Sequence, residues 1–195
     1  NAHYVDGPIR EDNQKSFIGM HPVPIVYGMT IGEYAEMINN ECWLNDSIAC
    51  NLFVVPCLNY THTTKYILPV APSPNLRSDF AVCVYPSLCM FEGTTVSVGR
   101  GTDAPFEVFG HPQFPILDFN FTPVSGFGSK KPVNENKVCY GYDLKCLGIL
   151  EVNKLNIDWL IQAKNLLGDS VTFINQPGFF DRLAGTSKLR LQILN

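Results

Sequence analysis

Charged residues are scarce in this sequence of 195 residues: Asp, Glu, Lys and Arg together make up 16%. The 14 Lys and Arg residues are outnumbered by 18 Asp and Glu residues, and the one run of adjacent basic residues is Lys130-Lys131. Because a nucleic-acid interface needs a basic face, we expect no nucleic-acid partner. With 46% apolar residues, the composition also excludes a disordered tail and a coiled coil.

Long hydrophobic runs are missing as well. The longest strongly apolar stretch, Leu52 to Leu58, is interrupted by Pro56 and is too short to span a bilayer, so we expect no membrane span. The first residues lack the basic and apolar regions of a signal peptide. The chain begins with a loop-like sequence and ends within a helical pattern that has no Gly cap, which indicates a fragment of a longer protein.

The seven cysteines include no Cys-x-x-Cys pair and no His at zinc-ligand spacing, so the sequence predicts no metal site. Their odd number argues against a fully paired disulfide framework. Most lie among apolar residues, as buried thiols do, and we expect free structural cysteines. No Ser has a nucleophile-elbow context and no Cys has an evident His partner, which leaves acyl transfer by a triad unsupported.

Local patterns predict a mixed α/β (α+β) fold that forms a single compact domain over residues 1–195. Thr30 and Glu33 form a capping box before a helix over residues 31–41. Asn51–Pro56 is a continuous apolar run typical of a buried strand. The other expected elements are helices over 80–91, from Asn156 to Gly168 and from Phe179 onward, strands over 94–98, 119–124 and 138–144, and an ordered functional loop over 60–75.

The densest group of chemically useful residues runs from Phe91 to Thr102. It combines the carboxylate of Glu92, the guanidinium of Arg100, and three glycines. An apolar wall of Met90 and Phe91 beside Glu92 should raise the pKa of its carboxyl group, as a general acid requires. The alternative is an ion pair with Arg100, which would lower that pKa and make Glu92 structural.

Residues 99–104 also match the dinucleotide pattern Gly-x-Gly-x-x-Ala, which leaves open a phosphate- or nucleotide-dependent enzyme. That motif needs a helix directly after it, and Pro105-Phe106 argues against one. The structural alternative is a Gly-rich turn between strands. In the polar loop, His62 is either a ligand contact or a hydrogen-bonded loop histidine. Asn75 is first a turn residue and second a ligand contact.

Several motifs follow one another along the chain: Ser16-Phe17-Ile18-Gly19-Met20, Pro22 to Glu33, Pro72-Ser73-Pro74-Asn75, Tyr85-Pro86, Phe91-Glu92-Gly93-Thr94, Ser97 to Thr102, Pro105-Phe106 and Gly110-His111-Pro112. In these motifs the chain resembles the second half of the NamZ-type exo-β-N-acetylmuramidase family. The resemblance implies an auxiliary domain from a protein about twice this length. It would pack against a Rossmann-like N-terminal half that this chain lacks, with the active site in the cleft between the halves.

The resemblance further implies a bacterial, secreted or periplasmic glycosidase that releases N-acetylmuramic acid from the non-reducing ends of peptidoglycan fragments, without a cofactor. Glu92 is the best candidate for the carboxyl group that protonates the leaving oxygen. Arg100 would bind the lactyl carboxylate of the substrate. The expected sugar-binding residues are Thr102, Tyr60, His62 and Asn75. The alternative function is a non-catalytic domain that binds cell-wall carbohydrate with the same residues.

Overall fold

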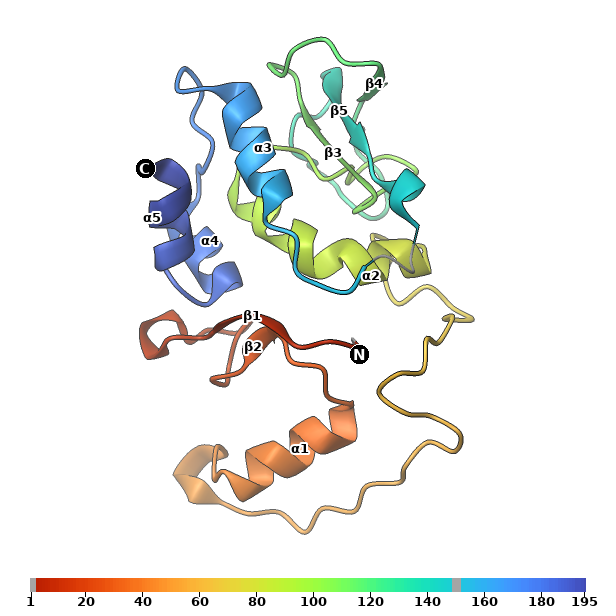
Figure 1. Ribbon diagram of the computed structural model, residues 1–195, viewed down its shortest axis with the longest axis vertical. Helices are drawn as coiled ribbons and strands as arrows, with labels where there is room; N and C mark the ends of the chain where they lie inside the picture. The colour runs from red at the N-terminus through yellow and green to blue at the C-terminus, as the bar shows by residue number, and fades with distance from the viewer. Residues whose placement is uncertain (1–2, 149–151) are drawn as a thin grey trace.

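The structure, a computed structural model, describes residues 3–148 and 152–195 and belongs to the mixed α/β class (Figure 1). The described strands are β1 (Asp6–Ile9), β2 (Pro24–Val26), β3 (Val108–His111), β4 (Phe119–Phe121) and β5 (Cys139–Asp143). The described α-helices are α1 (Ile31–Asn40), α2 (Asp79–Leu88), α3 (Asp158–Leu167), α4 (Pro177–Ala184) and α5 (Lys188–Leu194). Short 3₁₀ turns include η3 (Cys89–Gly93), which continues α2, and η4 (Lys145–Leu147).

The strands form two small antiparallel sheets. β1 pairs with β2, and β5 lies between β3 and β4. Gly110 and Gly141 face each other across β3 and β5, and a Cβ at Gly141 would lie 1.9 Å from the carbonyl oxygen of Phe109. A side chain at this crossing would collide with the backbone, so the close pairing of β3 with β5 depends on glycine.

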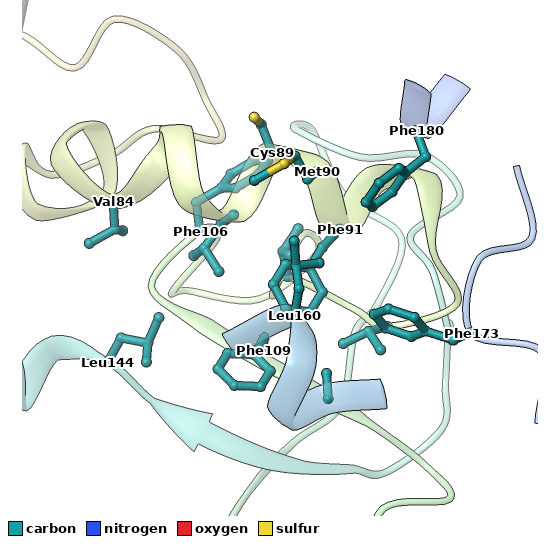
Figure 2. Close-up of a cluster of buried hydrophobic side chains, with 14 of the residues drawn as sticks. Val84, Cys89, Met90, Phe91, Phe106, Phe109, Leu144, Leu160, Phe173 and Phe180 are labelled. Atoms are coloured by element: carbon teal, nitrogen blue, oxygen red, sulfur yellow. The ribbon is translucent and has the colours of Figure 1, made fainter. Parts of the chain in front are cut away.

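The hydrophobic core lies between α2, η3, α3, α4 and the three-stranded sheet. Figure 2 shows Phe91 at its centre, with Phe109, Leu160, Phe173 and Phe180 around it. Phe91 and Phe109 are fully buried, and their rings stack with centroids 5.3 Å apart. Burial of each such side chain contributes about 1.5–3 kcal/mol. Packing in this core fixes the position of η3, which also contains Glu92.

The N-terminal strands are attached to the C-terminal helices. The backbone N–H of Glu11 donates to the carbonyl oxygen of Gly185 at 2.7 Å, and the N–H of Leu155 donates to the Asp6 carboxylate at 2.8 Å. Lys188 of α5 also forms an ion pair with Glu11 at 2.8 Å. These contacts bring the β1–β2 pair beside α4 and α5, while residues 41–78 form a long arc that returns to α2 (Figure 1).

The helix signals in the sequence are confirmed. Thr30 and Glu33 form the expected capping box of α1, and the Asn156 side chain accepts the backbone N–H of Asp158 in the first turn of α3. Gly168 ends α3 with a φ of +63°. The helical pattern after Phe179 is divided by Gly185, whose left-handed φ of +72° separates α4 from α5.

Two predicted strands are wrong. Residues 51–56 form no strand and are largely exposed, with Phe53 87% exposed. They find no partner strand among the described residues, so apolar content alone misled the prediction. Residues 94–98 make only an isolated bridge, between Ser97 and Gly110. The seven cysteines are free, but four of them are exposed, contrary to the expectation that most are buried.

Candidate active site

Glu92 lies on η3, directly after two residues that point into the core. Met90 and Phe91 are fully buried, which leaves the neighbouring Glu92 on the opposite side of the turn. Gly93 then packs against α4 so closely that a Cβ there would lie 2.7 Å from the Cβ of Phe180. The core on one side and α4 on the other therefore fix the backbone that carries Glu92.

Arg100 forms an ion pair with Glu92. Its guanidinium carbon lies 5.1 Å from the centre of the Phe106 ring, and its Nε is buried without a hydrogen-bond partner among the described residues. Phe106 is itself almost fully buried and has a φ of +58°, a strained conformation for a bulky residue. The turn over residues 99–106 thus places the Arg100 guanidinium between the Phe106 ring and the Glu92 carboxyl group.

Burial and charge act in opposite directions on Glu92. Burial raises the pKa of its carboxyl group, the Arg100 charge and hydrogen bond lower it, and the net effect is a raised pKa. The side chain nevertheless keeps 19% of its surface exposed, so it stays accessible. Glu92 therefore forms the ion pair of the second alternative, but its pKa is raised, as the first alternative expected, and not lowered.

Glu92 faces a cavity of about 500 Å³. This cavity lies between the N-terminal strands, the α2–η3 segment and α4; its lining includes Arg10, Phe17, His21, Tyr34, Tyr85, Cys89, Glu92, Phe179 and Arg182. Burial raises the pKa values of the Tyr85 hydroxyl and the Cys89 thiol to about 12, so both groups are protonated near neutral pH. Tyr85 can donate a hydrogen bond, and Cys89 is unsuited to act as a thiolate nucleophile.

An aromatic cluster adjoins the cavity from the N-terminal side. The His21 ring stacks on Trp43 with centroids 5.3 Å apart, and its Nδ1 lies 2.9 Å from the hydroxyl oxygen of Tyr34. Tyr34 in turn stacks on Tyr27 at 4.9 Å. Burial lowers the pKa of His21, with the charges of Lys15 and Arg10 adding to the effect. A neutral imidazole and aromatic faces beside a carboxyl group suit the binding of a sugar.

Comparison with known proteins places this chain in a family. Two family models match the chain: exo-β-N-acetylmuramidase NamZ, N-terminal, over residues 1–79, and exo-β-N-acetylmuramidase NamZ, C-terminal, over residues 83–195. The chain belongs to the NamZ family. The resemblance seen in the sequence had assigned the whole chain to the second half of such proteins, whereas the boundary between the two family models lies within it, close to the start of α2.

This NamZ-family chain is 30% identical, over 211 aligned residues, to peptidoglycan β-N-acetylmuramidase NamZ of Bacillus subtilis (strain 168). The match covers all of the chain and 50% of that protein, so the chain spans about half the length of this curated relative. A crystal structure of a DUF1343 family protein from Bacteroides fragilis NCTC 9343 is similar, with a TM-score of 0.92 and 48% identity over 98% of the chain and 54% of the other. A second DUF1343 family protein from that strain, 20% identical with a TM-score of 0.81 over 98% and 55% of the two chains, shares the fold.

The other predicted site residues of this NamZ-family chain lie away from Glu92. Asn75 and Thr102 line a separate depression of about 360 Å³ that shares no lining residue with the Glu92 cavity. The Asn75 side chain donates to the carbonyl oxygen of Gly128 at 2.7 Å, and the Thr102 hydroxyl donates to the carbonyl oxygen of Gly99 at 2.7 Å. Both are therefore engaged in holding turns, and their roles toward a sugar stay predictions.

The two predicted site residues of the loop over residues 60–75, Tyr60 and His62, line neither of these cavities. His62 Nε2 lies 2.8 Å from Oε1 of Glu33, which belongs to the capping box of α1, and this hydrogen bond raises the pKa of His62. His62 is thus the hydrogen-bonded loop histidine of the two alternatives, and contact with a ligand remains untested. Tyr60 is half-buried in the same loop and lines neither cavity.

Residues 99–104 do not form a nucleotide-binding loop of the dinucleotide type. They make a tight turn that leads into β3, with no helix behind it. A Cβ at Gly99 would lie 2.6 Å from the carbonyl oxygen of Ala104, so this glycine serves the packing of the turn itself. Within the described residues, no group of three or more His, Cys, Asp or Glu side chains could hold a metal ion, and no helix is long and apolar enough to cross a membrane.

Sequence reasoning missed Arg10, His21, Tyr34, Tyr85 and Arg182 as cavity residues. Arg10 and Arg182 are separated by most of the chain, and both line the cavity because the residues after β1 lie against Gly185, at the end of α4. The motifs before residue 33 drew attention to this segment, but they carried no signal that it faces Glu92.

Proposed function

We propose that this chain forms the part of a peptidoglycan glycosidase that carries its general acid, Glu92. The whole enzyme would release N-acetylmuramic acid from the non-reducing ends of cell-wall fragments. The proposal is supported by membership of the NamZ family and by the description of the B. subtilis relative as a peptidoglycan β-N-acetylmuramidase. Because peptidoglycan lies outside the cytoplasmic membrane, we place the activity in the periplasm or outside the cell.

The observation that carries the proposal is the position of Glu92, a largely buried carboxyl group that lines a cavity of about 500 Å³ beside Arg100 and has a raised pKa. Glycoside hydrolysis requires a protonated carboxyl group that gives its proton to the leaving oxygen as the glycosidic bond breaks. Glu92 would then be left as a carboxylate, which the adjacent Arg100 charge stabilises. Arg100 would thereby assist the step, and its predicted contact with the lactyl carboxylate is tested below.

The test is Glu92→Gln in the full-length protein, assayed on a natural disaccharide and on an aryl β-N-acetylmuraminide. Glutamine keeps the size of the side chain and removes the acid. A general acid matters most for a poor leaving group, so we expect the disaccharide rate to fall by about 10²–10⁴-fold and the aryl rate to fall by less.

The matched control is Glu36→Gln, on the exposed face of α1 and outside both cavities. It should leave both rates unchanged. Unchanged disaccharide turnover by a folded Glu92→Gln protein would remove Glu92 from the mechanism. Sugar binding without hydrolysis by the unaltered full-length protein would instead favour the non-catalytic carbohydrate-binding domain.

A further inference from the structure

Two arginines flank the cavity that Glu92 faces, on either side of the turn at Gly19. A Cβ at Gly19 would lie 3.5 Å from Cδ of Arg10 and 4.0 Å from the carbonyl oxygen of Arg182. Both arginines line the cavity. Their chemical situations differ, and the difference indicates what each one does.

The Arg10 guanidinium is already engaged with its own segment. Its Nε donates to the carbonyl oxygen of His21 at 3.2 Å, and a terminal nitrogen donates to the carbonyl oxygen of Glu11 at 2.7 Å. The other terminal nitrogen lies 3.5 Å from the Asp12 carboxylate, and the side chain is only 7% exposed. Arg10 therefore holds the N-terminal turns in place and has little capacity left for a ligand.

The Arg182 guanidinium is exposed and has no hydrogen bond or ion pair with any residue that the structure describes. It lies back along α4, since a Cβ at Gly178 would be 3.7 Å from one of its terminal nitrogens. Phe179 and Leu183, one turn before and one residue after it, line the same cavity. An unpaired guanidinium beside apolar surface can bind a carboxylate through two parallel hydrogen bonds.

The charge balance of the cavity favours an anionic ligand. Glu92 is the acidic residue in its lining, and its carboxyl group is paired with Arg100, which leaves no free negative charge there. The unmatched charge that remains belongs to Arg182, in a chain whose net charge is −4. A locally positive cavity on an acidic protein attracts anions selectively.

We infer that Arg182 binds the carboxylate of the lactyl group, the feature that distinguishes N-acetylmuramic acid from N-acetylglucosamine. This inference rests on the proposed function and names the residue that selects its substrate. Arg100, for which the sequence predicts this contact, is held by Glu92 and does not line the cavity. Arg182 is instead one of the residues that line the cavity, on the opposite element, α4.

The experiment compares the binding of N-acetylmuramic acid and of N-acetylglucosamine to the full-length protein by calorimetry. In Arg182→Gln we expect the affinity for N-acetylmuramic acid to fall by about 10- to 100-fold, the range for a lost charged hydrogen bond. The affinity for N-acetylglucosamine should change by less than about twofold, because that sugar has no carboxylate to lose. Arg182→Lys should keep part of the preference, since it keeps the charge and loses the paired geometry.

The control is Lys145→Gln, which removes one exposed positive charge on η4, outside the cavity, and should leave both affinities unchanged. Equal weakening of both sugars in Arg182→Gln, or no weakening, overturns the inference. It is also overturned if Arg100→Lys removes the preference while Arg182→Gln retains it. Loss of the preference in Arg182→Gln, in a full-length protein that does not hydrolyse the disaccharide, would uphold the inference and refute the proposed enzyme.

Discussion

At the scale of single residues, the pKa of Glu92 is affected more by burial than by the opposite charge of Arg100. An adjacent guanidinium ordinarily lowers the pKa of a carboxyl group. Here burial is the larger effect and the pKa is raised. The ion pair therefore sets how far the pKa rises, and it positions a carboxyl group that can still carry a proton.

This balance predicts how activity depends on pH. A general acid works in its protonated form, so activity falls as the pH rises through the pKa of Glu92. Arg100→Gln removes the charge that lowers this pKa, and the fall in kcat/KM should therefore move to higher pH. The rate on the disaccharide should also drop, because the carboxylate left after proton transfer loses its partner.

The measurement is the pH profile of kcat/KM in the full-length protein, with Lys145→Gln as the control for loss of one positive charge. The control should keep the profile of the unaltered protein. A profile that stays in place, or moves to lower pH, in Arg100→Gln would contradict the assignment of Glu92 as the acid.

The sequence predicts this pair because its two members lie eight positions apart on one short segment. A carboxylate, a guanidinium and glycines so close together along the chain indicate chemistry by their residue types alone. His21, Tyr34 and Arg182 carry no such local signal, because they come from distant parts of the chain and share one cavity only in the folded structure. A local motif does not encode long-range packing of this kind, so sequence reasoning missed these cavity residues.

At the scale of elements, the contact between η3 and α4 determines where Glu92 stands. Gly93 touches the backbone of Phe180, because a Cβ at Gly93 would lie 2.9 Å from its Cα and 3.0 Å from its nitrogen. The α4 backbone cannot yield as a flexible side chain would. Gly93→Ala should therefore push η3 and α4 apart and lower the free energy of unfolding by about 1–3 kcal/mol.

Chemical denaturation measures this change, and Gly126→Ala is the matched control. A Cβ at Gly126 meets only a carbonyl oxygen at 4.0 Å, so its effect should stay within about 0.5 kcal/mol. Gly93→Ala should also reduce disaccharide hydrolysis, since Glu92 moves with the turn. Full stability and full activity in Gly93→Ala would show that the contact does not position Glu92.

Helices were predicted better than strands for a physical reason. The capping box at Thr30 and the glycine after α3 act within a few residues, so the sequence contains the whole signal. A strand needs a partner, and residues 51–56 have none among the described residues. β4 and β5 were predicted close to their observed positions, because both contain aromatic residues and find each other across one turn-rich segment.

At the scale of the whole molecule, the segment before α2 contains apolar side chains that this chain does not bury. Exposed examples include Phe53 (87%), Val55 (77%), Leu58 (89%) and Ile67 (76%). Contiguous exposed apolar residues commonly mark an interface. They lie in the part that matches the N-terminal family model, and the relatives are about twice as long as this chain.

We therefore expect residues 51–58 to pack against a part of the full-length protein outside this chain. Phe53→Asp tests the proposal by urea denaturation. In the 195-residue chain the change should alter the free energy of unfolding by less than about 0.5 kcal/mol, because the ring is already exposed. In the full-length protein it should lower that free energy by about 2 kcal/mol or more, since a buried ring would be replaced by a charge. A small effect in both proteins would mean that this segment stays in solvent.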